Sequence, residues 1–488
     1  MTKTRAHVAA LLLTVGCTTG RPVAADLVIE NVTLIDGTDH APRPGMSVAV
    51  KDGKVVAVEE AGPLRVSSGA TMVDGRGKYL IPGLADMHVH LSKAPENDFA
   101  LFLANGVTTI RDMGGGLATS LRLRDAMRSG RILGPEVLIA GPTLDAEYVV
   151  RVVRNPSKEP TRESVPDSAT AVMIVDSLAR MGVDHIKVHS MMPRAAYFAV
   201  LAEAKKRGVF VVGHIPDSVT ATEAIEAGQR TLEHNVEVAE AESGRGAEIT
   251  RWMLAAMQRV MDSSTESEVV AVYEVRTAAA DSALRSYDPA VASAFAELAA
   301  KRDVWFDPTL VVREARIRIN DPEYLNRPEL IFLPRAVKMD NTSPNPPASI
   351  AEADRQWQNV LLTMRPLVQA GAKFLAGTDV PVVPLVPGFS LQRELGLLVE
   401  GGLSPLQALQ AATRNAAAAA GKLAEAGTIE PGKRADLVLL DADPLADIGN
   451  TRRIRAVVTR GRLLDRDRLD GLLRAAEVFA AEARKQAH

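Results

Sequence analysis

Between residues 82 and 420 the sequence alternates short apolar runs with longer segments of helical character. The first run carries His88, and seven more follow it: GVTTIRDMG, EVLIAGPTL, DHIKVHS, VFVVGHIP, TLEHN, VWFDPTLVV and KFLAGTDVP. Eight such runs, alternating with segments rich in Ala, Leu, Arg and Glu, are typical of parallel strands joined by helices. The alternation therefore predicts an α/β fold, with a TIM-like (β/α)8 barrel over residues 82–421.

The two ends of the chain differ from this middle part. DLVIENVTLIDG and GKVVAVEEAG precede it, and RADLVLLDADP and IRAVVTRGRLL follow it. These segments combine Val, Ile and Leu with turn residues, which predicts short strands. Near the end of the middle part, Ser404 followed by Pro405 is the pattern of a helix N-terminus. Residues 471–488 predict one amphipathic helix.

Residues 1–25 have the pattern of an export signal. Lys3 and Arg5 precede the apolar stretch HVAALLLTVG, and small residues follow, so cleavage is expected after Ala25. TVGC also resembles a bacterial lipoprotein signal, although Thr14 stands where Leu is usual, so a lipid anchor on Cys17 is the alternative. Either route predicts an exported protein of the periplasm or cell envelope. Cys17 is the single cysteine, so no internal disulfide can form.

Charge and composition exclude several kinds of partner. The net charge is −3 and no Lys/Arg-rich block stands out, which argues against nucleic acid. No internal stretch approaches the length of a membrane-spanning helix. A small-molecule substrate is the expected partner, and the sequence leaves open whether the chain forms a homo-oligomer.

Residues with metal-binding chemistry stand at the ends of the predicted strands, where barrel enzymes carry their active sites. His88 and His90 are two apart, so on a strand they point to one face. In DHIKVHS, Lys187 likewise shares a face with His189. Imidazoles that converge on one point suit a metal ion. The candidate residues are His88, His90, Lys187, His214, His234 and Asp379.

These residues and the words around them resemble the amidohydrolase superfamily. IPGLADMHVHL and AGTDVP are similar to the family's first and eighth strands, and GTIEPGKRADLVLL is similar to the passage where its chains leave the barrel. The pattern is most similar to the imidazolonepropionase-like and prolidase-like branch. The resemblance implies that residues 26–81 and 422–470 together build a small composite β-sandwich domain beside the barrel.

The resemblance also implies a site for two divalent ions, for which zinc, manganese and cobalt are all suitable. His88, His90 and Asp379 would hold one ion, and His214 and His234 the other. A site with one ion and only some of these ligands is the alternative.

Two of the candidate residues have further roles by this resemblance. Lys187 would bridge both ions as N6-carboxylysine, because a free ammonium has no lone pair to offer. Asp379 would accept the proton of the attacking water and pass it to the leaving group. Together they predict a hydrolase of C–N bonds, acting on a dipeptide or an N-acyl amino acid. Cyclic amides, lactones or carbamates are the alternative substrates, and a non-catalytic envelope binding protein is the distant alternative.

Four further features carry smaller predictions. Arg111 and Asp112 are expected to form a structural pair, and Asp86 to have a structural role deeper in its strand. His189 is expected either to contact substrate or to lie at the rim facing water. The Pro- and Asn-rich residues 320–350 are expected to form a lid or substrate wall, or else a solvent-exposed elaboration.

Overall fold

The computed structural model describes residues 23–60, 66, 68–91, 95–153, 158–234, 238–263, 266–334 and 347–486. The predicted export signal therefore lies almost wholly outside the described residues, and so does its cysteine, Cys17. No helix within the described ranges is both long and apolar enough to cross a membrane.

Parallel strands occupy all eight predicted runs. Seven strands form one sheet in the order β10-β9-β11-β12-β13-β14-β15, and three form a second in the order β6-β7-β8. Their bounds are β6 Leu84–Val89, β7 Val107–Asp112, β8 Glu136–Ile139, β9 Thr143–Asp145, β10 Arg162–Ser164, β11 His185–Val188, β12 Phe210–Gly213, β13 Thr231–Glu233, β14 Trp305–Asp307 and β15 Lys373–Phe374. The run EVLIAGPTL contains β8 and the start of β9, and the short strand β10 lies outside the runs that the sequence indicated.

Backbone hydrogen bonds link both edges of the three-stranded sheet to the seven-stranded sheet. Met87 N donates to Ala376 O (2.9 Å), and Asp379 N donates to His88 O (2.8 Å), which joins β6 to the segment after β15. At the other edge, Asp184 N donates to Ile139 O (2.8 Å), which joins β8 to the residue before β11. The carboxyl ends of strands that are far apart in the sequence are thus brought to one region.

Helices cover the parallel strands, and one large apolar cluster lies between the two layers. Ser404 caps α14, as the sequence predicted, and Pro405 stands at its first position. The predicted late helix is divided, because α14 ends before Thr413 and α15 begins after it. The bounds are α1 Pro95–Ala104, α2 Leu117–Arg128, α3 Glu147–Val153, α4 Ser168–Arg180, α5 Arg194–Arg207, α6 Ala221–Ala227, α10 Pro289–Ala300, α11 Leu310–Ile317, α12 Ile350–Gln369, α13 Phe389–Glu400, α14 Pro405–Ala411 and α15 Arg414–Ala419.

A mixed sheet combines strands from both ends of the chain. Its order is β18-β17-β16-β5-β1-β2-β3, with β4 paired to β1, and β5 pairs antiparallel with β16 so that Leu80 faces Leu439. The bounds are β1 Leu27–Leu34, β2 Arg43–Lys51, β3 Lys54–Glu60, β4 Thr71–Asp74, β5 Tyr79–Pro82, β16 Leu437–Leu440, β17 Ile454–Thr459 and β18 Arg462–Leu464. The terminal helix α16 (Arg466–Gln486) begins five residues before the predicted start, because the Asp465 side chain accepts from Arg468 N (2.9 Å) and caps it.

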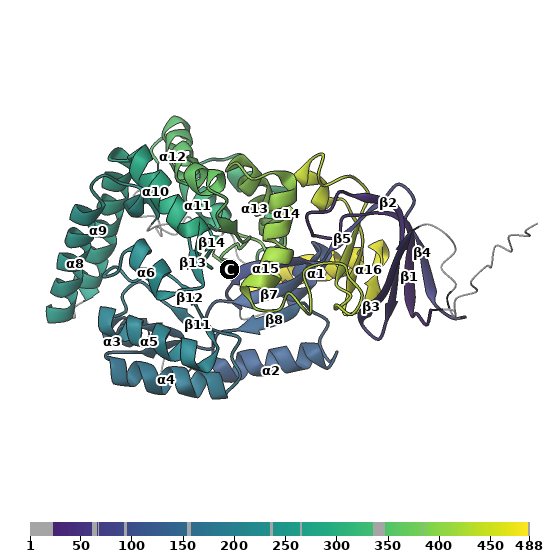
Figure 1. Cartoon of the computed structure of the whole chain (residues 1–488), viewed down its shortest axis with the longest axis horizontal. Coiled ribbons are helices and arrows are strands. Elements are labelled where there is room, and N and C mark those ends of the chain that lie inside the picture. The colour runs from purple at the N-terminus through teal and green to yellow at the C-terminus, as the bar shows by residue number, and fades with distance from the viewer. Residues whose placement is uncertain are drawn as a thin grey trace, which may run out of the picture.

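The long separation between His234 and Asp379 contains an added helical hairpin. After α7 (Val238–Ala241), α8 (Gly246–Ser263) and α9 (Glu266–Arg285) pack against each other and against loop residues such as Met191. Figure 1 shows α8 and α9 at the end of the molecule opposite the mixed sheet. The hairpin is an elaboration that the sequence did not single out.

The predicted lid segment, residues 320–350, is only partly described, because residues 335–346 lie outside the described ranges. Its described part includes two short 3-10 helices, η1 (Tyr324–Asn326) and η2 (Pro328–Phe332). Arg484 of α16 donates to Ile331 O (2.7 Å) and Leu333 O (2.5 Å) there. This part therefore packs against the terminal helix.

Candidate metal centre

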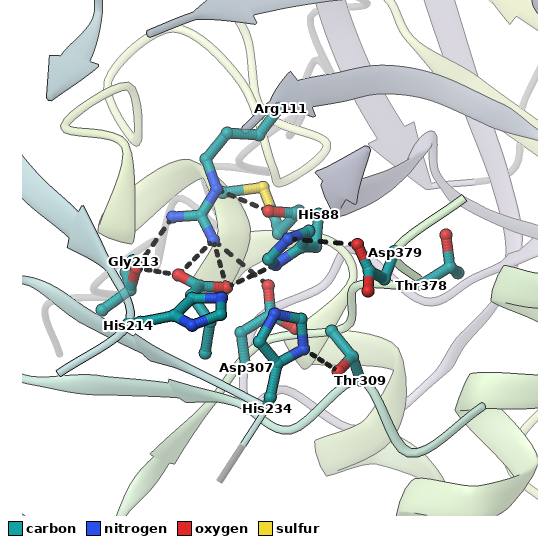
Figure 2. Close-up of polar contacts among 12 residues, drawn as sticks. His88, Arg111, Gly213, His214, His234, Asp307, Thr309, Thr378 and Asp379 are labelled. Carbon is teal, nitrogen blue, oxygen red and sulfur yellow. Dashed lines mark hydrogen bonds and ion pairs between the residues drawn. The ribbon is translucent and has the colours of Figure 1, made fainter. Parts of the chain in front are cut away.

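The six predicted metal-binding residues lie at the carboxyl ends of parallel strands, and Figure 2 shows His88, His214, His234 and Asp379 among them. His90 Nε2 and His88 Nε2 lie 3.3 and 3.5 Å from Asp379 Oδ1. The His234 ring lies 4.6 Å from the His88 ring and 4.8 Å from the His214 ring, measured between centroids. Residues from five strands and the loops after them thus converge on one cluster.

Lys187 lies in β11 beside this cluster. Its side chain is almost fully buried, and Nζ has no hydrogen-bond partner among the described residues. Burial lowers the pKa of Lys187 to about 8, and its charge acts on His88, His214 and His234. A buried amine with a lowered pKa is unprotonated more often than a surface lysine, and only then can its nitrogen act as a nucleophile or ligand.

The four imidazoles share one feature: a second group lies at Nδ1. His88 Nδ1 is 2.9 Å from Glu233 Oε2, His214 Nδ1 is 2.6 Å from Ser190 Oγ, and His234 Nδ1 is 2.7 Å from Thr309 Oγ1. His90 Nδ1 makes a longer contact, 3.5 Å, with Gly114 O. In each ring Nε2 is therefore the atom left to face the cluster.

The charge states of the cluster suit a cation. Burial lowers the pKa of His88 to about 4 and the pKa values of His214 and His234 well below their usual range, so all three are neutral at pH 7. Although burial opposes ionisation, the hydrogen bond from His90 and the neighbouring histidines hold the pKa of Asp379 well below its usual range. Neutral imidazoles and an ionised carboxylate are metal-ligating forms.

These residues pass a test of fit for divalent ions. Ligand atoms of His88, His234 and Asp379 all lie within 4.8 Å of one another. His88 Nε2 is buried without a hydrogen-bond partner among the described residues, and so is Lys187 Nζ. Buried polar atoms without partners are costly unless something binds them. Imidazole nitrogen and carboxylate oxygen are donors that zinc accepts.

The backbone at the cluster is held in unusual conformations. His234 and Asp379 have φ values of 67° and 65°, and Thr309, which contacts His234, has a φ of 45°. Such left-handed conformations cost about 1–3 kcal/mol each for residues other than glycine. A Cβ at Gly377 would lie 2.6 Å from the Asp307 carboxylate and 2.7 Å from His88 Cβ, so this position requires glycine. The surrounding contacts therefore fix where these side chains project.

A second group of buried charges lies behind His88, and it corrects one prediction. Arg111 does not pair with Asp112; it donates to Glu233 Oε1 (3.0 Å) and to Asp307 Oδ2 (3.1 Å). Asp112 instead accepts from Ser120 Oγ (3.0 Å). Neighbouring residues of a strand point to opposite faces, so the two side chains cannot share partners.

The pKa values of the two carboxyl groups around Arg111 are shifted in opposite directions. Although burial opposes ionisation, Arg111 and His88 hold the pKa of Glu233 below its usual range. Burial and the charge of Glu233 raise the pKa of Asp307 well above its usual range. The sequence reasoning missed Glu233, although TLEHN places it one residue before His234.

Two other predicted residues lie at the edge of the cluster. The ring of His189 stacks on that of His214 with centroids 4.3 Å apart, and His189 Nδ1 lies 3.1 Å from Asp145 Oδ2. Asp86 accepts from Thr378 Oγ1 (2.7 Å), which supports the segment that carries Asp379. His189 is mostly buried, with 17% of its side chain exposed, so it does not project into solvent.

A model of the amidohydrolase family matches residues 79–464. The chain belongs to this family. The match covers every strand of the two parallel sheets and all six cluster residues, so the amidohydrolase assignment rests on the part of the chain that builds the site.

Named amidohydrolases match to different extents. N-acyl-D-aspartate deacylase of Alcaligenes xylosoxydans xylosoxydans is 29% identical over 213 residues, which is 42% of this chain and only 40% of the deacylase. Imidazolonepropionase of Symbiobacterium thermophilum is 25% identical over 479 residues, covering 91% of this chain and 98% of that enzyme. A solved Xaa-Pro dipeptidase with bound methionine has a TM-score of 0.63 at 20% identity, covering 90% of this chain and 99% of that one. At that identity the likeness to the dipeptidase shows the fold alone.

Proposed function

We propose that the protein is a metal-dependent amidohydrolase that cleaves the amide C–N bond of a dipeptide or an N-acyl amino acid. The observation that carries the proposal is the buried cluster in which three imidazoles have their Nδ1 atoms held and a buried Lys187 Nζ has no hydrogen-bond partner among the described residues. This arrangement is what a divalent ion with nitrogen and oxygen ligands requires.

In the proposed centre, each ion has its own ligands. His88, His90 and Asp379 hold one ion, and His214 and His234 hold the other. The short distances from Asp379 Oδ1 to His90 Nε2 and His88 Nε2, 3.3 and 3.5 Å, support the first set. Zinc is the first choice of metal, with manganese and cobalt as substitutes.

Lys187, as N6-carboxylysine, would supply ligand oxygens to both ions. A buried amine with a pKa near 8 has a neutral fraction that can add carbon dioxide at Nζ, and the resulting carbamate has oxygen atoms to offer. The modification would also turn a buried cation without a hydrogen-bond partner into an anion surrounded by neutral imidazoles.

Divalent ions bound there would polarise the carbonyl of the substrate and acidify a water molecule. Asp379 is ionised at neutral pH and lies within 3.5 Å of two imidazoles, so its carboxylate can accept a proton from the attacking water. Asp379 then returns that proton to the departing nitrogen, which leaves as an amine. His88, His214 and His234 stay neutral throughout, because burial disfavours the charged form of each ring, and at His88 it outweighs the opposing effect of the Glu233 carboxylate.

A hollow that opens to solvent lies beside His234 and is the place proposed for an apolar group of the substrate. Helices α9, α11 and α12 supply most of its walls, and Arg313 and Thr363 are polar residues in its lining. The apolar lining residues are Ala239, Ala280, Leu284, Leu310, Val360 and Met364.

The proposal extends to the organisation of the whole chain. Residues 82–421 form a closed (β/α)8 barrel, residues 26–81 and 422–470 form a composite β-sandwich domain, and residues 471–488 belong to the terminal helix. The linked sheet edges and the shared mixed sheet support this division. Residues 1–25 direct export to the periplasm or cell envelope, with Cys17 as the alternative lipid anchor.

The first test is metal content per chain, on protein produced with added zinc and bicarbonate. The wild type is expected to hold about two equivalents, and Lys187→Ala far less. Lys206→Ala is the control, because Lys206 is 70% exposed on α5. About one equivalent, unchanged in Lys187→Ala, would contradict the bridging lysine and favour the single-ion alternative.

The second test is a substrate panel on the metal-loaded protein. Release of amino acid from dipeptides or N-acyl amino acids with apolar groups is expected, and cyclic amides, lactones and carbamates are assayed beside them. Turnover of a lactone alone would replace the proposed bond with the alternative. Absence of metal together with absence of turnover would favour a binding protein.

A further inference from the structure

Arg111 is the centre of a buried hydrogen-bond network inside the ring of strands. Its guanidinium donates to Met87 O of β6 (2.5 Å), Thr231 Oγ1 of β13 (3.1 Å) and Asp307 Oδ2 of β14 (3.1 Å). It also donates to both oxygens of Glu233, at 3.0 and 3.2 Å. In Figure 2, dashed lines run from the Arg111 guanidinium to several groups beside His88, of which Asp307 is labelled. One side chain of β7 thus fixes groups on three other strands.

Glu233 connects this network to the metal centre. Its Oε2 lies 2.9 Å from His88 Nδ1, and both side chains are buried, with exposures of 0% and 1%. A carboxylate only accepts hydrogen bonds, so His88 Nδ1 must carry the hydrogen. The lone pair of His88 is then on Nε2, the atom that faces Asp379 and His90.

The contacts of Glu233 leave its carboxylate one orientation. Thr231 Oγ1 donates to Oε1, and Arg111 NH2 donates to both oxygens. If the Glu233 carboxylate rotated away from His88, it would therefore lose a buried, charge-assisted hydrogen bond.

Arg111 also occupies a place that a metal ion could otherwise take. Ligand atoms of His88, Glu233 and Asp307 all lie within 4.8 Å of one another, and all three residues are buried. The guanidinium contacts both carboxylates of this group, so it supplies the positive charge there. An ion is therefore directed to the other side of His88, where Nε2 lies.

We propose that Glu233 and Arg111 are positioning residues of the metal centre: Arg111 fixes the Glu233 carboxylate, and Glu233 holds His88 with its lone pair on Nε2 toward the ion. The inference rests on the proposed function, because it requires that His88 binds a metal. It goes further in assigning two residues outside the ligand set a role in metal affinity.

The ion pairs around Arg111 could instead serve only to hold the strands together. A substitution at Asp307 distinguishes this structural role from the positioning role. Within the described residues Asp307 hydrogen-bonds Arg111 but not His88. In Glu233→Gln, an amide NH2 group replaces one carboxylate oxygen. That oxygen accepts a hydrogen bond from His88 or Arg111, whereas an NH2 group can only donate one. Asp307→Asn changes a buried partner of the same guanidinium and leaves the contact with His88 in place, so it is the matched control.

The experiment measures zinc affinity of the metal-stripped protein by competition with a chelating dye, with bicarbonate present. Glu233→Gln is expected to weaken the tighter zinc site about 10- to 100-fold. Asp307→Asn is expected to keep an affinity close to that of the wild type, even where its melting temperature falls. The visible absorption of the cobalt-substituted proteins reports the change in coordination directly.

Three results would test the positioning role and the proposed function separately. Equal zinc affinity in Glu233→Gln and wild type, or an equal loss in Asp307→Asn, would overturn the positioning role and leave the proposed function intact. No zinc binding by the wild type would contradict the proposed function itself. If Glu233→Gln does not fold, Thr231→Val decides: it removes one hydrogen bond to Glu233, a several-fold loss of zinc affinity is expected, and an unchanged affinity overturns the proposal.

Discussion

The two sides of the candidate metal centre are supported by different chemistry. On one side, His88 Nδ1 meets the Glu233 carboxylate, which belongs to a buried ion-pair network around Arg111. On the other side, His214 and His234 meet the hydroxyl groups of Ser190 and Thr309. His88 is therefore held by a charged group, and His214 and His234 are held by neutral groups.

This difference has a consequence for rigidity. A carboxylate can only accept, so it determines which nitrogen of His88 carries the hydrogen. A hydroxyl can donate or accept, so Ser190 and Thr309 allow either tautomer of their histidines. We therefore expect the ion bound by His88 to be held more tightly than the ion bound by His214 and His234. Disturbing the charged support of His88 should also cost more free energy than removing a hydroxyl group on the other side.

The largest effect is expected from removing the charge at the centre of the network. Arg111→Met leaves the Glu233 and Asp307 carboxylates buried, with exposures of 0%, without their cation. Breaking a buried ion pair in this way destabilises a protein by about 3–5 kcal/mol. Urea unfolding of the metal-stripped protein measures this change in the free energy of unfolding.

A surface arginine provides the control for this measurement. Arg180 pairs with Asp176 on α4 and is 71% exposed, so Arg180→Met is expected to change stability by less than about 0.5 kcal/mol. Equal effects of the two substitutions on stability would show that the Arg111 network contributes no more than a surface ion pair. The proposed difference between the two sides of the metal centre would then be contradicted.

An intermediate effect on the free energy of unfolding is expected when the pH is lowered. The pKa of His88 is about 4 in the folded protein and about 6.5 in the unfolded chain, so the unfolded chain binds the extra proton between these values. The contribution of neutral His88 is thus fully present above pH 6.5 and is lost as the pH falls toward 4. At pH 5 the loss is about 2 kcal/mol.

A comparison with His88→Gln isolates this contribution from other titrating groups. The difference in the free energy of unfolding between wild type and His88→Gln, both metal-stripped, should decrease by that amount from pH 7.5 to pH 5. A difference that stays constant over this range would mean that His88 is not held neutral by its surroundings.

The smallest effects are expected on the hydroxyl side. Ser190→Ala and Thr309→Val each remove a neutral hydrogen bond to a histidine, a loss of about 1 kcal/mol or several-fold in zinc affinity. Both should fall short of Glu233→Gln in the same dye-competition assay. Ser120→Ala, which removes a buried hydroxyl bonded to Asp112, is the control and should leave zinc affinity unchanged. Losses as large as that of Glu233→Gln would erase the distinction between the two sides.

Local patterns in the sequence predicted much of the fold and of the candidate cluster. The eight apolar runs are strands because each is short, buried and bounded by turns, as DHIKVHS is around β11. Alternation along a strand also put His88 and His90 on one face, and both rings approach Asp379. The same alternation could have warned against pairing Arg111 with Asp112.

Other features were beyond local reasoning. The roles of residues 320–350 and of the α8–α9 hairpin depend on what they pack against, and the described part of the first packs on α16. Ser190 and Thr309 follow β11 and β14 with nothing in their neighbours to indicate that each would contact a histidine. Their positions depend on the path of the chain after the strand ends.

The sequence by itself determined the alternation of strands and helices, the identity of the candidate ligands and the face on which His88 and His90 project, because all three follow from periodicity and residue chemistry within a few positions. Only the tertiary structure decided which partner each imidazole finds. Arg111 is 122 residues from Glu233 and 196 from Asp307, and His88 is 145 from Glu233. Such contacts depend on how distant strands align across the sheets, and the burial that lowers the pKa values of the histidines exists only once those strands have assembled.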